Sequence, residues 1–213
     1  MQKYYRLALY YLDRLGISFF FGGFYFYNLE LPIAPHSNAK TTLEIHEIDK
    51  SNLRPEHIIG WVTIDQALQI LSEPNTYFFV AFENNEIVGS CFLEIGDVNL
   101  DYIDCHNTTP EHSSYITHLI VQPNKRGHGI AYQLLNFAFA KSEEIGKTSI
   151  IISCAQKNTA VQNVFSKMNF NKYLSIRYLR FTLFRCYFIT RINKENIKTN
   201  TIYLSNNIDV FKH

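Results

Sequence analysis

The stretch VQPNKRGHGIA, residues 121–131, decides which fold the chain adopts. It contains a proline, two cations and two glycines, Gly127 and Gly129, and it leads into the first residues of an amphipathic helix. Glycines at this spacing allow several backbone N–H groups to surround an anion, and the N-terminus of a helix adds the positive end of its dipole. The stretch therefore predicts a binding site for a phosphate or a pyrophosphate.

The residues around this turn exclude two common nucleotide-binding motifs. A P-loop requires Gly-x-x-x-x-Gly-Lys followed by Ser or Thr, a pattern that the chain does not contain. A dinucleotide-binding motif requires a third glycine and an acidic residue that ends the second strand. Ala131 is small enough for the third position, but the next predicted strand, SIIISCA at 149–155, carries no acidic residue.

The hydrophobic pattern predicts alternating strands and helices on both sides of the turn. An Asn84-Asn85 pair between two apolar runs predicts a hairpin, and Thr63 is placed to cap a helix that ends before Pro74. Residues 96–112 are polar and predict a loop. The predicted strands are 42–48, 77–83, 86–95, 114–121, 149–155 and 176–189, and the predicted helices are 64–73, 130–146 and 158–168.

Two motifs, one at the turn and one at the start of the helix predicted at 158–168, resemble those of the GNAT superfamily of acyl-CoA-dependent N-acetyltransferases. The first runs from Asn124 to Gly129 and departs from the family pattern at Asn124, where Gln or Arg is expected. The second begins at Asn158 and ends in Asn-Phe where the family has Gly-Phe; asparagine is the next best residue for a left-handed helix end. The resemblance covers residues 42–190 and implies an α+β fold, with a central mixed, mostly antiparallel sheet flanked by helices.

The resemblance also implies acetyl-CoA as the co-substrate and no metal ion. In such a fold the strand before the turn splays from the next strand, so the backbone groups of Leu119, Ile120 and Val121 would pair with the amides of the pantetheine arm. The second motif would place Asn158 against the pantetheine and Phe165 near the sulfur. The residues implied for the pyrophosphate are Lys125, Arg126, Gly127, His128, Gly129, Ile130 and Ala131.

The resemblance leaves the proton donor for the departing thiolate open. The family often uses a tyrosine at the position of Phe165, and phenylalanine has no proton to donate. The proton comes either from a water molecule or from a tyrosine close in sequence, such as Tyr132 or Tyr173. The third alternative is that the chain lacks a donor and is a weak catalyst. Cys154 is better explained as a small buried residue than as a nucleophile, because the family transfers the acyl group directly in a ternary complex.

Three residues are candidates for the catalytic group that receives the proton of the attacking amine: His118, Glu94 and Thr117. Family members often place Glu or His on the strand before the turn, where this chain has Tyr115, Thr117 and His118. Strand alternation puts Tyr115 and Thr117 on one face and His118 on the other, unless a β-bulge re-aims His118. An unperturbed histidine titrates at about pH 6.5, so His118 suits this role if it faces the site. Glu94 would receive the proton of the amine through a water molecule.

Charge is unevenly distributed along a chain whose net charge is +1. Residues 55–124 contain ten acidic residues and no Lys or Arg, whereas residues 125–213 contain fourteen Lys or Arg and four acidic residues. The near-neutral total excludes a global electrostatic argument for nucleic acid. The acidic half predicts a small amine acceptor that carries positive charge. The alternatives are an acetyltransferase acting on an amino-sugar nucleotide, and a catalytically degenerate protein that binds or senses acyl-CoA.

The sequence is predicted to divide into an N-terminal aromatic extension (1–41), an acetyltransferase domain (42–190) and a polar C-terminal tail (191–213). The extension predicts a short helix and an aromatic strand that packs on the main domain or on a partner chain. Its apolar run of about fifteen residues is shorter than a membrane span, so association of residues 1–30 with a membrane surface is the less favoured alternative. Four cysteines without a Cys-x-x-Cys pair predict reduced thiols and fit a cytoplasmic protein. The protein is expected to be a monomer or a homodimer.

Overall fold

The computed structural model describes residues 19–32, 43–103, 105–181, 184–192, 198–203 and 210–211. The helix predicted before residue 19 lies outside this set. The strands are β1 (Phe19–Glu30), β2 (Glu44–Glu47), β3 (Thr76–Glu83), β4 (Glu86–Glu94), β5 (Asp97–Leu100), β6 (Cys105–Thr108), β7 (Ser113–Val121), β8 (Ser149–Ala155), β9 (Asn171–Phe181), β10 (Phe184–Ile192) and β11 (Lys198–Tyr203). The helices are α2 (Ile64–Ile70), α3 (Ile130–Glu144) and α4 (Thr159–Lys167), with short 3-10 turns η1 (Pro55–His57), η2 (Asp101–Ile103) and η3 (Pro123–Lys125). None of these helices is long and apolar enough to cross a membrane.

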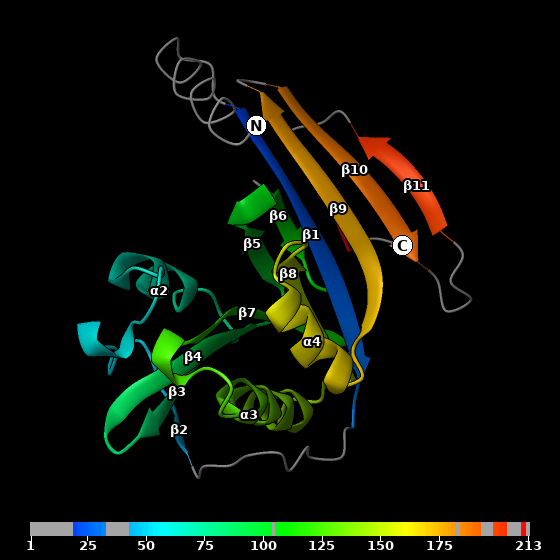
Figure 1. The fold of residues 1–213 in the computed structure, drawn as a ribbon. Helices are drawn as coiled ribbons and strands as arrows, with labels where there is room; N and C mark the ends of the chain where they lie inside the picture. The colour runs from blue at the N-terminus through cyan, green and yellow to red at the C-terminus, as the bar shows by residue number, and fades with distance from the viewer. Residues whose placement is uncertain are drawn as a thin grey trace.

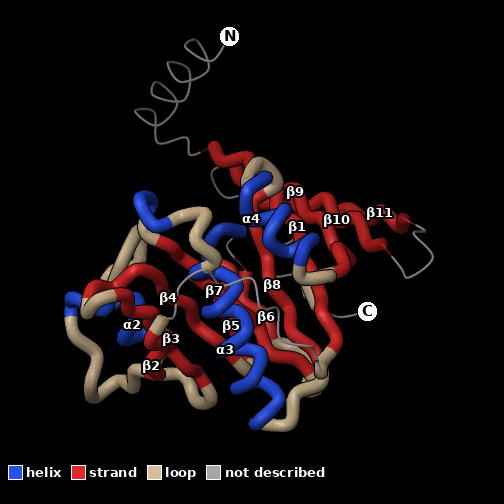
Figure 2. The backbone as a smooth tube through the Cα atoms, turned by 60° about the horizontal axis from the view of Figure 1, so that its bottom comes forward, coloured by secondary structure: helices blue, strands red, loops and turns tan. Residues whose placement is uncertain are grey.

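Nine of the strands form one sheet in the order β11-β10-β9-β1-β8-β7-β4-β3-β2, and β5 pairs with β6 in a separate hairpin (Figure 1). Neighbouring strands of the large sheet are antiparallel except β7 and β8, which are parallel. Figure 2 shows the sheet continuing through β9, β10 and β11 to one side of β1, and through β4, β3 and β2 to the other side of β7. The fold is therefore α+β with a mixed, mostly antiparallel sheet, as the sequence predicts.

Local sequence signals explain several element boundaries. The β3–β4 hairpin turns at Asn84 and Asn85, both with positive φ (52° and 66°), which asparagine tolerates better than most residues. The hydroxyl of Thr63 accepts a hydrogen bond from the backbone N–H of Gln66, and the Gln66 side chain accepts one from the N–H of Thr63, so α2 begins with a capping box. This helix ends at Ile70, three residues before the predicted end.

The segment 96–112, predicted as a loop, instead contains the β5–β6 hairpin. Its buried residues Val98, Leu100 and Cys105 alternate with exposed ones, so each strand of the hairpin presents one face to the core. The alternation extends over only four residues in each strand, which is too short to stand out among the polar residues around it.

The single strand predicted at 176–189 is wrong, because this region belongs to two antiparallel strands, β9 and β10. Phe181 pairs with Phe184 where the two strands meet. Apolar and polar residues continue to alternate across this junction, so the period alone does not mark the end of the first strand.

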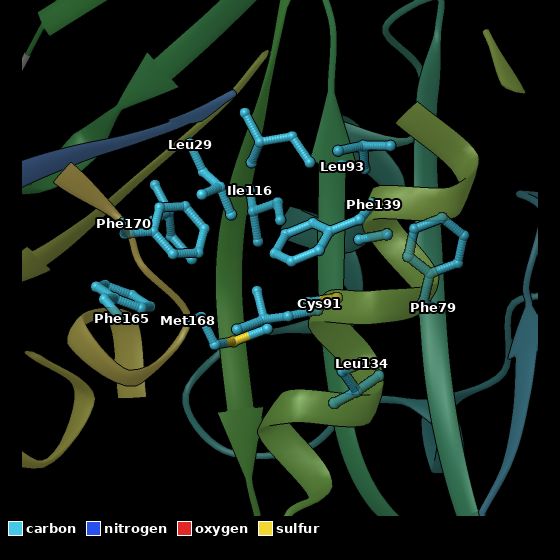
Figure 3. Packing of buried hydrophobic residues seen from close by; sticks show 14 of the residues in the cluster. Leu29, Phe79, Cys91, Leu93, Ile116, Leu134, Phe139, Phe165, Met168 and Phe170 are labelled. Atoms are coloured by element: carbon cyan, nitrogen blue, oxygen red, sulfur yellow. The ribbon is translucent and has the colours of Figure 1, made fainter. Parts of the chain in front are cut away.

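Helices α3 and α4 cover one face of the sheet, and the β5–β6 hairpin and α2 cover the other. α3 and α4 pack on one face through a cluster that includes Leu134, Phe139, Phe165 and Met168 (Figure 3). The β5–β6 hairpin packs on the other face, against β1, β7 and β8, and α2 covers β3 and β4 on that same face. The central strands are therefore buried on both sides, and a site between them is enclosed by side chains from both layers.

β1 lies inside the sheet, between β8 and β9. Phe24 pairs with Ala155 of β8 and with Ile176 of β9. By alternation Tyr27 faces α3 and α4, whereas Phe26 faces the hairpin side. The aromatic strand predicted near the N-terminus thus supplies side chains to both layers of the core, and β11 adds an outer strand next to β10.

A glycine in β4 sets how closely α3 approaches the sheet. A Cβ at Gly89 would lie 2.9 Å from Ile130 Cγ2, 2.9 Å from Leu134 Cδ1 and 3.1 Å from the carbonyl oxygen of Ile120. These distances are shorter than ordinary van der Waals contacts, so the first turn of α3 packs where only a glycine leaves room. Gly89 thereby fixes the position of the helix N-terminus relative to β7.

Candidate active site

The parallel strands β7 and β8 separate partway along their length. Their pairing runs from Ser113 opposite Ser149 to Ile116 opposite Ile152. Beyond this point β7 continues to Val121 beside β4, while the end of β8 continues beside β1. The edges that β7 and β8 turn toward each other are therefore released from mutual pairing, and backbone groups become available to a ligand between the strands.

A cleft of about 320 Å³ occupies this separation. Its lining comes from both faces of the sheet, because side chains from α4 and from the η2 turn both reach it. The lining residues are Phe24, Trp61, Asn99, Tyr102, Tyr115, Ile116, Thr117, His118, Leu119, Ile152, Ser153, Cys154, Ala155, Asn158, Val161 and Phe165. No Asp, Glu, Lys or Arg is among these described lining residues.

A β-bulge in β7 re-aims His118. Thr117 pairs with Phe92 and Ile120 pairs with Ser90, so two residues of β7 face one residue of β4 between these pairs. His118 adopts a left-handed backbone with φ of 51°. Its ring consequently lies 4.7 Å from that of Trp61 and 5.7 Å from that of Phe92, on the hairpin side of the sheet. The bulge therefore brings His118 to the same face as Thr117, whereas strand alternation alone places the two residues on opposite faces.

Burial controls the protonation of His118. The surrounding aromatic rings exclude water and lower the pKa of His118 from 6.5 to about 4. Its Nδ1 atom is buried and has no hydrogen-bond partner among the described residues. The imidazole is therefore neutral at pH 7, and its ring lines the cleft without carrying a charge.

Glu94 and Thr117 form a buried polar contact beside the cleft. The Thr117 hydroxyl donates a hydrogen bond to Oε1 of Glu94, and both side chains are less than 9% exposed. Glu94 lies directly opposite Tyr115 in the β4–β7 register, so the carboxylate and the phenol are neighbours on one face. Thr117 lines the cleft, and Glu94 lies behind it.

Three hydroxyl groups meet where β7 and β8 begin to separate. The hydroxyl oxygens of Tyr102 and Tyr115 are 2.7 Å apart, and they lie 2.7 Å and 2.6 Å from the Ser153 hydroxyl oxygen. Burial raises the pKa values of both tyrosines, so all three groups stay protonated at neutral pH. The rings are held by aromatic contacts, with Phe24 4.3 Å from Tyr102 and Phe211 5.7 Å from Tyr115.

We call Tyr102, Tyr115 and Ser153 the hydroxyl triangle. Sequence reasoning missed it because Tyr102 belongs to the segment predicted as a loop. One signal was available: Ser153 interrupts the otherwise apolar run of β8 at a position that alternation places on the same side as Ile151.

The glycine-containing turn adopts the backbone that its residues predict. Gly127 and Gly129 both have φ of 83°, a left-handed conformation that glycine adopts without a steric penalty. Gly129 is the N-cap of α3, and no side chain caps this end of the helix. The first described bond of the helix is donated by Gln133 to the carbonyl of Gly129, so the N–H groups of the preceding residues are directed out of the helix end.

The two cations of this turn differ in their surroundings. Arg126 is exposed, and its Nε donates a 3.4 Å hydrogen bond to the carbonyl of Val121. Lys125 instead forms a 2.5 Å ion pair with Glu83 at the end of β3, and this hydrogen bond raises the pKa of Lys125. Arg126 and His128 are thus exposed at the turn, whereas Lys125 ties it to the β3–β4 hairpin.

α4 presents Asn158, Val161 and Phe165 to the cleft. The side chain of Asn158 caps the helix by accepting a 3.3 Å hydrogen bond from the N–H of Val161. At the other end Asn169 has φ of 62°, so this asparagine forms the left-handed helix end that the second motif predicts.

Phe165 packs against a tyrosine that comes from β1. The ring centroids of Phe165 and Tyr27 are 5.1 Å apart in an edge-to-face contact, and the Tyr27 hydroxyl is hydrogen-bonded to the thiol of Cys154. Burial raises the pKa of Tyr27 to about 12 and that of Cys154 to about 11. Both groups are therefore protonated at neutral pH. Tyr132 and Tyr173, which are close in sequence to the motifs, pack into the two core clusters and are not among the residues that line the cleft.

Within the described part of the chain, no three His, Cys, Asp or Glu side chains are placed to hold a metal ion together.

A protein-family model matches more than half of the chain. The model of the acetyltransferase (GNAT) family matches residues 42–170, which include both motifs, the bulge and the separation of β7 from β8. Among curated proteins no match to the sequence was found.

Several solved structures have a similar fold. A GCN5-related glucosamine N-acetyltransferase region of a fungal multi-domain GH3 β-N-acetylglucosaminidase has a TM-score of 0.56 and 16% identity, with 83% of this chain and 22% of that chain covered. A GNAT-family acetyltransferase from Novosphingobium aromaticivorans has a TM-score of 0.52 and 11% identity, with 76% and 65% covered. The aminoglycoside acetyltransferase AAC(6')-Iy, in complex with a bisubstrate analogue, has a TM-score of 0.47 and 18% identity, with 62% and 92% covered.

Proposed function

The chain belongs to the acetyltransferase (GNAT) family, and from this premise we propose that it transfers an acetyl group from acetyl-CoA to the primary amine of a small acceptor by direct attack in a ternary complex. The cleft between β7 and β8 carries the proposal. Its lining residues come from both faces of the sheet, so a donor on the α3–α4 side and an acceptor on the hairpin side would meet between the strands.

We assign the donor to the α3–α4 side. The N–H groups from Gly127 to Ala131 and the exposed side chain of Arg126 would receive the pyrophosphate, because an uncapped helix N-terminus after two left-handed glycines favours an anion. The pantetheine would run along the open edge of β7 at residues 119–121, with Asn158 beside it and Phe165 near the sulfur. Lys125 would hold the turn in place through its ion pair with Glu83.

The proposed step needs no covalent enzyme intermediate. The lone pair of the neutral amine attacks the thioester carbonyl carbon, an N–C bond forms, and the C–S bond breaks with its electron pair leaving on sulfur. The nitrogen loses one proton and the thiolate gains one, so a neutral amine gives an amide and CoA thiol in balance. Water would supply the thiol proton, because the Phe165 side chain has none to give.

The three catalytic candidates take different parts in this proposal. His118, which lines the cleft, would position the acceptor and would not receive its proton, because a pKa of about 4 makes it a poor proton acceptor at pH 7. Glu94 would accept the proton of the amine through a water, and Thr117, which lines the cleft, would hold the carboxylate in place.

The acidic half of the sequence supports attraction of a positively charged amine. Residues 55–124 carry ten acidic residues and no Lys or Arg, so an approaching ammonium group meets a field of opposite sign. The described cleft lining carries no carboxylate, however, and further charges on the acceptor would find no partner there. We therefore propose a monoamine that is attracted as a cation and reacts as a neutral base. The four free, buried cysteines fit a reducing compartment such as the cytoplasm.

The test is calorimetric titration with acetyl-CoA, followed by detection of released CoA thiol across a panel of primary amines. Micromolar binding together with amine-dependent thiol release would support the proposal. Binding without turnover on the whole panel would favour a protein that senses acyl-CoA, and absence of binding would overturn the assignment of the turn.

A further inference from the structure

Aromatic side chains form the acceptor side of the cleft. Phe24 of β1, Tyr102 of the η2 turn and Trp61 of the loop before α2 all line it, although they come from three separate segments. The Phe24 and Tyr102 rings lie 4.3 Å apart, and Trp61 packs on His118 while remaining 67% exposed. An indole that stays this exposed beside a cleft offers a flat apolar surface that a ligand can cover.

The hydroxyl groups on the same side have no free hydrogen to donate to a ligand. Each hydroxyl of Tyr102, Tyr115 and Ser153 has one hydrogen, and three mutual hydrogen bonds use all three. The Thr117 hydroxyl donates to Glu94. A sugar with several hydroxyl groups would leave many of them unpaired against aromatic rings, which costs binding energy.

The hydroxyl triangle can still accept hydrogen bonds. Each oxygen has two lone pairs, and a closed ring of three hydrogen bonds occupies one on each atom. A primary amine can therefore donate its N–H hydrogens to the triangle and keep its own lone pair directed elsewhere. This orientation is the one needed for attack on a carbonyl carbon at the point where β7 and β8 separate.

We propose that the acceptor is an arylalkylamine: its aromatic ring is held between Trp61 and the Phe24–Tyr102 pair, and its amine is held by the hydroxyl triangle. The inference rests on the proposed acetyl transfer and names the substrate class of the same cleft. The described residues that line the cleft include no Asp, Glu, Lys or Arg. The cleft therefore disfavours the ammonium form of the acceptor and favours its neutral amine. Tyr102 links the two parts of the site, since its ring contacts Phe24 and its hydroxyl belongs to the triangle.

Fluorescence tests acceptor binding without requiring turnover. Trp61 is the single tryptophan of the chain, so emission excited at long wavelength reports on this cleft alone. With the protein saturated by CoA, 2-phenylethylamine should change this emission saturably, whereas spermidine and glucosamine at equal concentration should not. A saturable response to spermidine or glucosamine and none to 2-phenylethylamine would overturn the inference, even if acetyl transfer itself were never detected.

Steady-state rates test the same preference during catalysis. With saturating acetyl-CoA, kcat/KM for 2-phenylethylamine and tryptamine should exceed that for spermidine and glucosamine by at least about tenfold. 2-Cyclohexylethylamine separates an aromatic ring from a merely apolar one and should fall between the two groups. Equal or higher kcat/KM for spermidine or glucosamine would overturn the inference while leaving the proposed acetyl transfer intact.

Variants connect the preference to the named side chains. Trp61→Ala should raise KM for 2-phenylethylamine by about tenfold and leave the acetyl-CoA dissociation constant unchanged, and Trp61→Phe should restore most of the affinity. Phe21→Ala, which removes a 57% exposed aromatic side chain outside the described cleft, is the matched control. Tyr102→Phe opens the triangle and should lower kcat more than it raises KM. An unchanged acceptor KM in Trp61→Ala would contradict the assignment.

Discussion

Thr117 and Glu94 join two neighbouring strands on the hairpin side of the sheet: the Thr117 hydroxyl of β7 donates a hydrogen bond to the buried carboxylate of Glu94 in β4. A carboxylate that is only 6% exposed must be stabilised by hydrogen bonds, because burial removes most of its hydration. The pair therefore connects stability to the proposed catalytic role of Glu94.

Thr117→Val keeps the shape of the side chain and removes the donor. We expect the free energy of unfolding to fall by about 1–3 kcal/mol, since a buried acceptor loses a partner. Thr117→Ser retains the hydroxyl, so its free energy of unfolding should fall by less. Urea denaturation followed by circular dichroism measures both variants, and equal stability of Thr117→Val and the unchanged protein would show that this hydrogen bond contributes nothing.

Gly127→Glu should weaken acetyl-CoA binding by at least about tenfold, because the substitution adds bulk and negative charge to the proposed pyrophosphate site. Gly146→Glu is a matched control: Gly146 has φ of 77°, close to the 83° of Gly127, and a Cβ at either position has nothing within 4 Å. Both variants carry the same backbone strain, but Gly146 lies past the opposite end of α3. Titration calorimetry of the two variants separates strain from repulsion, and equal losses would contradict the assignment of the turn.

The activity should lack an inflection from His118 near pH 6.5. Its pKa lies at about 4 because the ring is buried, so the imidazole stays neutral throughout the pH range in which the enzyme is assayed. We expect kcat/KM to rise with pH according to the pKa of the amine substrate. A profile with an inflection near pH 6.5 that disappears in His118→Asn would show that this residue accepts the proton after all.

His118 should also make the protein less stable in acid. The unfolded chain takes up a proton on this residue near pH 6.5, whereas the folded protein resists protonation down to about pH 4. The stability is therefore complete above the unfolded pKa and falls by roughly 3 kcal/mol as the pH drops through this interval. His118→Asn, in which asparagine tolerates the positive φ, should lose this part of the pH dependence in urea titrations at pH 7 and pH 4. If the stability of His118→Asn depended on pH as strongly as that of the unchanged protein, this prediction would be contradicted.

Cys154 should be dispensable for catalysis. Burial raises the pKa of its thiol to about 11, so almost none is a nucleophilic thiolate at neutral pH. Cys154→Ala should change kcat by less than about tenfold, and double-reciprocal plots at several acceptor concentrations should intersect. Parallel plots, or an acetyl group found on the protein by mass spectrometry, would contradict direct transfer.

The parts of the site that local sequence determines were predictable. Gly127 and Gly129 adopt left-handed backbones because no other residue does so as readily, and Asn169 ends α4 in the same way. The glycine spacing, the cap of α2 and the Asn84-Asn85 turn depend on neighbours within a few residues. The sequence therefore carries them directly.

The parts that depend on long-range packing were not predictable. The position of His118 follows from a bulge, which alternation cannot locate without knowing the register with β4. The hydroxyl triangle joins Tyr102, Tyr115 and Ser153 from a hairpin, β7 and β8. Tyr27 reaches Cys154 because β1 lies beside β8, and no local pattern states which strand an aromatic segment will join.

The place of β1 inside the sheet has a consequence for how the protein is made. Phe24 leaves the ribosome long before its pairing partners Ala155 and Ile176, so a nascent chain carries an aromatic strand with both edges unpaired for most of its synthesis. Pairing over such a sequence separation is slow, and an unpaired aromatic strand is a binding site for chaperones and for other nascent copies. A chain that has already translated the glycine turn and α4 still lacks β9, the second neighbour of β1. Folding efficiency in the cell should therefore depend on how well Phe19–Glu30 is shielded until translation reaches β9.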